Sequence, residues 1–181
     1  MIRVKISISG EQLMMHKMNT DFTQQQVKKK IAKDNFETQA KMAAYTEDDG
    51  TLYFPSDWIV GTMIQASKFF KKEKPPLSNV IAGLVSIKPA HISLNTKKYE
   101  VDVRNVHNFK AGRFPVGRPL IKDWKASFTF EWNPEILSIT PASLKSILAM
   151  AGQAVGIGSY RPAHTGPFGR FEITGWEEEV F

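Results

Sequence analysis

Apolar and polar side chains alternate without interruption from residue 124 to residue 132, and this pattern restricts the possible folds more than any other in the chain. Because successive side chains of a strand point to opposite faces of a sheet, the segment predicts a strand with one buried face and one face in water. Its apolar positions are Trp124, Ala126, Phe128, Phe130 and Trp132. The fold must therefore contain a sheet that other elements cover on one side.

A second alternating strand and two amphipathic helices are predicted to complete this layer. Residues 2–9 alternate strictly and form a strand that ends at Gly10. A helix over residues 57–71 follows Ser56, a favourable N-cap residue, and a helix over residues 141–154 begins with a proline. Shorter strands are predicted over residues 51–54, 80–87, 91–94, 99–106 and 170–174, and a peripheral polar helix over residues 23–33.

Reduced to its core, this order is β-α-β-β-α-β, the ferredoxin-like or RRM-like pattern of an α+β fold. We expect one antiparallel sheet with both helices on one face and with the first and last strands as neighbours. Residues 1–181 would form a single domain, with residues 11–50 as an insertion and residues 107–119, rich in glycine and proline, as a long loop. Six side chains should be buried between the layers: Ile59, Met63, Phe128, Phe130, Leu144 and Leu148.

The composition excludes several classes of protein. The 181 residues include no cysteine, which excludes disulfides, zinc held by thiolates and cysteine nucleophiles. No apolar run approaches the roughly 20 residues of a membrane span, and the first residues lack the apolar core of a signal peptide. The consecutive acids Glu47–Asp49 are typical of a solvated turn. We therefore expect a cytoplasmic protein that needs no metal, no cofactor and no membrane.

The positive charge is concentrated in one segment. The net charge is +6, and residues 104–125 contain a single acid, Asp123. Against it stand six basic residues: Arg104, Lys110, Arg113, Arg118, Lys122 and Lys125. A concentration of this kind is typical of a nucleic-acid contact. Membrane headgroups fit less well because no amphipathic helix carries these charges.

A glycine-rich segment between the last helix and the last strand is the second candidate contact. Glycine lets another backbone approach closely, arginine pairs with phosphate and tyrosine stacks on bases. The residues expected to bind are Gly156, Gly158, Tyr160, Arg161, His164, Gly169 and Arg170. Gly156, after the helix, should also adopt a left-handed conformation. The alternative is an ordinary connection in which these glycines only cap and turn.

Two segments resemble parts of RAMP superfamily proteins. Residues 156–170 are similar to their C-terminal glycine-rich loop. Their strand–proline–helix entry is similar to the run Leu52-Tyr53-Phe54-Pro55-Ser56-Asp57-Trp58-Ile59. This superfamily includes the filament-forming backbone subunit of CRISPR effector complexes.

Most of the chain also resembles a set of small phage proteins of unassigned role. The similar segments are residues 118–124 and the glycine-rich end of the chain, although residues 163–167 lengthen the loop relative to that set. The two resemblances imply an RRM-like, phage-encoded protein of the bacterial cytoplasm. It would bind the backbone of single-stranded nucleic acid, with RNA favoured over DNA, as a homo-oligomer or filament and without catalysis.

Two other functions stay open. Some RAMP relatives are metal-independent ribonucleases, and His164 could act as a general acid or base beside Tyr160 or Lys122. The third class is a phage assembly factor or an inhibitor of a host enzyme, whose basic loop would contact an acidic protein. Nucleic acid that co-purifies with the protein would favour binding over this third class.

Overall fold

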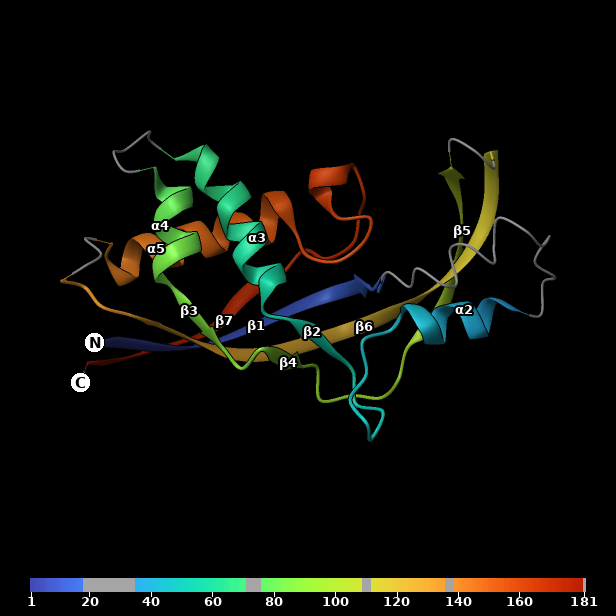
Figure 1. Cartoon of the computed structure of the whole chain (residues 1–181), viewed down its shortest axis with the longest axis horizontal. Coiled ribbons are helices and arrows are strands. Elements are labelled where there is room, and N and C mark those ends of the chain that lie inside the picture. Colours follow the sequence, from blue (N-terminus) through green and yellow to red (C-terminus); the bar gives the residue numbers. More distant parts are fainter. Residues whose placement is uncertain (18–34, 71–75, 109–111, 136–138, 181) are drawn as a thin grey trace.

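The computed structural model describes residues 1–17, 35–70, 76–108, 112–135 and 139–180, and it has an α+β fold built on one antiparallel sheet (Figure 1). The strands are β1 (Ile2–Met14), β2 (Tyr53–Pro55), β3 (Ser86–Lys88), β4 (His91–Ser93), β5 (Glu100–Asn108), β6 (Gly112–Trp132) and β7 (Glu172–Val180). The helices are α2 (Phe36–Ala43), α3 (Asp57–Ala66), α4 (Leu77–Leu84) and α5 (Pro141–Met150). A 3₁₀ turn follows α3, and a π-helical turn over residues 151–155 follows α5.

The strand β1 lies in the middle of the sheet. The order is β3-β6-β1-β7, and β5 pairs with the other part of β6. β1 pairs with β6 from Ile2 opposite Trp132 to Met14 opposite Leu120, and it pairs with β7 on its other edge. The prediction that the first and last strands are neighbours is therefore confirmed. β2 and β4 form a separate two-stranded sheet.

Helices α3, α4 and α5 lie over one face of this sheet (Figure 1). All six side chains expected in the core are buried, none of them more than 3% exposed. The alternating segment of β6 also behaves as predicted, because its five apolar side chains are all buried. On the opposite face, charged side chains pair across strands, with Arg3 2.8 Å from Glu131 and Lys5 2.9 Å from Glu179. Within the described part of the chain, no helix is long and apolar enough to cross a membrane.

The loop predicted over residues 107–119 is wrong. Residues 112–120 pair with β5 and make β6 a strand of 21 residues, so that β5 and the first half of β6 form a long hairpin. Pro115 and Pro119 suggested a loop because proline cannot donate a ladder hydrogen bond. In the part of β6 before Leu120, β5 is the one paired strand. The nitrogen of a proline there can face away from β5, where no ladder hydrogen bond is needed.

The start of the predicted insertion over residues 11–50 is also wrong, because residues 11–14 continue β1. Gly10 does not end the strand. A Cβ at Gly10 would lie 2.6 Å from the indole nitrogen of Trp124, so the missing side chain makes room for that ring. The helix predicted over residues 23–33 lies outside the described residues, and α2 was not predicted.

The strand predicted over residues 80–87 is wrong as well. Most of it belongs to helix α4, and only Ser86–Lys88 forms a strand. Leu77, Val80 and Ile81 pack against the core at helical spacing. A short apolar run of this kind does not distinguish a helix from a buried strand.

Leu148 provides a test of the core. It is fully buried in α5, so the Leu148→Ala variant loses apolar contacts and leaves a cavity. We expect the free energy of unfolding to fall by about 2–5 kcal/mol. Urea denaturation followed by circular dichroism measures this change, and a loss below about 1 kcal/mol would contradict the burial of Leu148.

Candidate nucleic-acid interface

The glycine-rich segment leaves α5 through the π-helical turn. The Gly156 N–H donates to the Ala151 carbonyl oxygen at 2.8 Å. Gly156 has φ +72° and ψ 175°, which confirms the expected positive φ but not the left-handed helical conformation. This region of backbone conformation is almost restricted to glycine.

Gly158 and Gly169 pack this segment against other backbone. Both have positive φ, and a Cβ at either position would overlap a carbonyl oxygen, of Met14 or of Ile157. The Ser159 N–H donates to the Met14 carbonyl at 2.9 Å, just beyond Gly158. The Cβ positions of both glycines are thus filled by protein, whether or not the loop also binds a ligand.

A hollow of about 420 Å³ lies where this loop meets the end of β1, the start of α3 and the middle of β6. It is lined by His16, Trp58, Arg118, Gly158, Ser159, Tyr160, Arg161 and His164. Two arginines and two histidines are present, and no acidic residue is among the lining residues. An anion could therefore enter without meeting a carboxylate.

The two arginines are held in place by neighbouring residues of the loop. Arg118 Nη1 donates to Ser159 Oγ at 2.6 Å, and Arg161 Nη1 donates to the Gly158 carbonyl at 3.2 Å. The Nε atom of each arginine is buried and has no hydrogen-bond partner in the part of the chain that the structure describes. Burial lowers the pKa of both guanidinium groups, although they stay charged at neutral pH. Both cations are therefore partly desolvated and fixed in orientation, with donors left over.

Tyr160 lies near two guanidinium groups. Its ring centre is 5.8 Å from Arg104 and 5.3 Å from Arg118, close enough for cation–π attraction. Its φ of +50° is unusual for a bulky residue, and strained backbone of this kind is concentrated at functional sites. Whether the ring also stacks on a base stays a prediction, since both of its cationic neighbours would compete with that base.

Two histidines face the same hollow. His164 was predicted as a site residue, whereas His16 was not, because no spacing pattern marks it. Although His16 is more than a third exposed, partial burial lowers its pKa, and the positive charge of Arg118 lowers it further. Within the described residues, no group of three or more histidines and carboxylates could hold a metal ion.

A series of aromatic rings begins at the hollow. Trp58, which sequence reasoning did not assign to the site, contacts Tyr45 edge to face with ring centres 5.5 Å apart. Tyr45 contacts Tyr53 at 5.7 Å, and Tyr53 stacks on His91 at 4.0 Å. Lys17 Nζ lies 5.7 Å from the Tyr45 ring centre. Tyr53 is buried, whereas Tyr45 and Trp58 are partly exposed, and partly exposed rings beside cations are typical of surfaces on which bases stack.

Some predicted binding residues lie outside the hollow. Arg104 pairs with Asp102 at 2.6 Å, and Lys122 pairs with Glu100 at 2.8 Å. Arg113 is exposed on β6 near the tip of the hairpin, and Lys110 lies outside the described residues.

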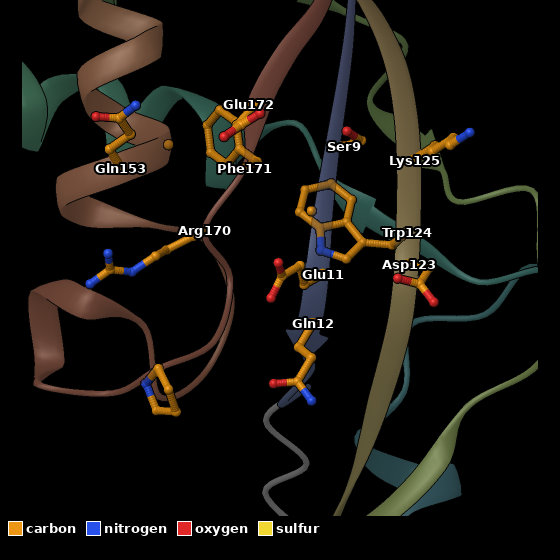
Figure 2. A pocket seen from close by; sticks show the side chains of 13 residues that line it. Ser9, Glu11, Gln12, Asp123, Trp124, Lys125, Gln153, Arg170, Phe171 and Glu172 are labelled. Carbon is orange, nitrogen blue, oxygen red and sulfur yellow. The ribbon is translucent and has the colours of Figure 1, made fainter.

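Lys125 and Arg170 line a second cavity, of about 620 Å³, between the glycine-rich segment and strands β1 and β6. Figure 2 shows Arg170 on the loop side of this cavity and Lys125 on the side of β6. Three carboxylates line it too, those of Glu11, Asp123 and Glu172. This mixture of charges suits a polyanion less well than the hollow does.

Neither a protein-family model nor a curated protein matches this sequence.

Proposed function

We propose that this chain binds single-stranded nucleic acid through its sugar–phosphate backbone, with a phosphate in the hollow between Arg118 and Arg161. The observation that carries the proposal is the pair of arginines that line one hollow, each oriented by a hydrogen bond from its Nη1, with no acid among the lining residues. Their remaining guanidinium donors would form charge-assisted hydrogen bonds with phosphate oxygens.

The aromatic series beside the hollow supports a single strand rather than a duplex. Bases can stack on exposed rings only when they are unpaired. Trp58 lines the hollow itself and Tyr45 follows it, so a base could stack next to a bound phosphate. The preference for RNA, the formation of oligomers and the origin in a phage rest on the resemblance to RAMP and phage proteins.

The finer fold assignment belongs to the same proposal. The strand order β3-β6-β1-β7, with α3 after β1 and α5 after β6, supports a ferredoxin-like core of the kind found in RRM-like proteins. In this core, the hollow lies beside the sheet rather than on its open face, where Ser7 Oγ lies 3.0 Å from Ser127 Oγ and charged side chains pair.

The dependence of binding on salt tests the proposal. Each phosphate neutralised on a single strand contributes a slope of roughly −0.7 to log K against log salt. Fluorescence anisotropy with a labelled single-stranded RNA should show a negative slope. We expect Arg113→Ala to reduce its magnitude by roughly 0.7 if the hairpin contacts the strand. Lys122→Ala is the control, because Lys122 is already paired with Glu100.

The outcomes separate the candidate functions. If single-stranded RNA, single-stranded DNA and both duplexes fail to bind at low salt, nucleic-acid binding is wrong and the interaction protein is favoured. The presence of His16 and His164 in one hollow favours a ribonuclease as the second candidate. In that case the RNA would be shortened after incubation with the protein, which a denaturing gel detects, and His16→Ala would prevent the cleavage.

A further inference from the structure

We infer that the hollow takes the terminal phosphate of a strand, a phosphomonoester, in preference to a phosphodiester within the strand. This inference rests on the proposed function and specifies its ligand. The inference follows from a contrast between two sets of basic residues. Two arginines line the hollow, whereas other predicted binding residues lie beside carboxylates.

The two arginines converge on one place. Their Nη1 atoms donate to consecutive residues, Arg161 to the Gly158 carbonyl and Arg118 to the Ser159 hydroxyl. Both guanidinium groups can therefore contact one phosphate, instead of successive phosphates along a strand. A phosphomonoester carries a charge of about −1.5 to −2 at pH 7, and a diester carries only −1. Two fixed cations without a neighbouring acid suit the more highly charged group.

Among the predicted binding residues that the structure describes, no row of unpaired cations leads away from the hollow; Lys17, which was not predicted, lies beside the Tyr45 ring. Arg104 and Lys122 are in ion pairs, and Lys125 and Arg170 line a cavity with three carboxylates. Arg113 is the exposed exception and lies toward the tip of the hairpin. An internal segment of a strand would need several such contacts in a row, whereas the end of a strand needs only one.

The size and the walls of the hollow also fit the end of a nucleic-acid strand. Its volume of about 420 Å³ lies in the range of small-molecule sites, about 300–1,000 Å³. The loop wall is fixed by the hydrogen bond from Ser159 to the end of β1 and by the positive φ of Gly158 and Tyr160. His16 and His164 on the lining could donate further hydrogen bonds to a dianion.

The test compares RNA octamers of one sequence that carry a phosphate or a hydroxyl at the 5′ end, and a second pair that differs at the 3′ end. The fluorescent label is placed at the opposite end. A nonamer with two hydroxyl ends is the charge control, because its additional phosphodiester adds charge without a terminal phosphate. Anisotropy titrations give the Kd of each RNA for the wild-type chain, Arg161→Met and Arg113→Ala.

We expect one phosphorylated octamer to bind about tenfold more tightly than its hydroxyl counterpart and than the nonamer. Arg161→Met should remove this preference, and Arg113→Ala should keep it even if overall affinity falls. Equal affinity within both pairs of octamers, or equal affinity for the nonamer and the tighter-binding phosphorylated octamer, would overturn the inference and leave the proposed function standing. If no RNA binds, both are overturned. A melting curve confirms that Arg161→Met is folded, and Arg118→Met is used in its place if it is not.

Discussion

Replacing Arg118 and Arg161 together with methionine is expected to weaken the binding of single-stranded RNA by at least about 100-fold. A hydrogen bond to a charged group contributes about 1.5–3 kcal/mol, and 1.4 kcal/mol corresponds to a factor of ten in Kd. Methionine keeps much of the apolar stem that arginine packs against its neighbours, so the change mainly removes the charge and the donors. Anisotropy titration at low salt measures the loss.

The stability of the same variant separates a binding role from a structural one. Methionine removes two buried Nε donors that have no partner, but it also removes the hydrogen bonds to Ser159 Oγ and to the Gly158 carbonyl. Because these two effects oppose each other, we expect the melting temperature of the double variant to stay close to that of the parent protein. A large fall in melting temperature would assign these arginines to the fold instead.

Arg104→Met is the matched control for binding. Arg104 contacts Tyr160 and Phe168 but is paired with Asp102 and does not line the hollow. Its substitution should change Kd by less than a few-fold. If it weakens binding as much as the double substitution does, the contact surface extends over the hairpin and is not confined to the hollow.

Gly158→Val is expected to destabilise the fold by several kcal/mol. A β-branched residue at φ +78° is strained by about 1–3 kcal/mol, and its Cβ would overlap the Met14 carbonyl oxygen. Relieving that overlap would displace the hydrogen bond from Ser159 to Met14 and so pull the loop away from β1. Chemical denaturation measures the loss, and we expect weaker binding to accompany it because Arg161 donates a hydrogen bond to the Gly158 carbonyl.

Gly61→Ala is the control for this substitution. Gly61 lies inside α3, and a Cβ there would meet no atom within 4 Å. Alanine in a helix is about 0.5–1 kcal/mol more favourable than glycine, so this variant should be slightly more stable than the parent. If Gly158→Val is as stable as the parent, the loop does not pack against β1 as described.

The parts of the fold that could be predicted are those in which the burial of one face produces a regular spacing of apolar residues in the sequence. The alternation in β6 and the stripe containing Leu144 and Leu148 are such patterns, because each element buries one face. The first half of β6 could not be predicted, since the local preference of Pro115 and Pro119 is for a turn. Pairing with β5 overrides that preference, and pairing between distant segments leaves no local signal.

The candidate site was predicted in composition but not in arrangement. The charge count found Arg118 and the glycine-rich segment indicated Arg161 and His164, but neither signal could tell these residues from Lys122, which pairs with Glu100 across two strands. His16 was missed because it reaches the hollow only through the continuation of β1 beyond Gly10. Trp58 was missed as a site residue because it lies at the start of the predicted helix, where residues 52–59 indicated a fold element and not a binding site.

The length of β6 has a consequence for how the sequence can vary. Because side chains alternate along a strand, inserting or deleting one residue between Arg118 and Trp124 would turn every position on one side of the change to the opposite face. Either the aromatic side chains of β6 from Trp124 onward would leave the core, or Arg118 would turn away from Ser159. Changes in length should therefore be tolerated at the tip of the hairpin and selected against within this stretch. A deletion scan read out by folding and by binding would map that boundary residue by residue.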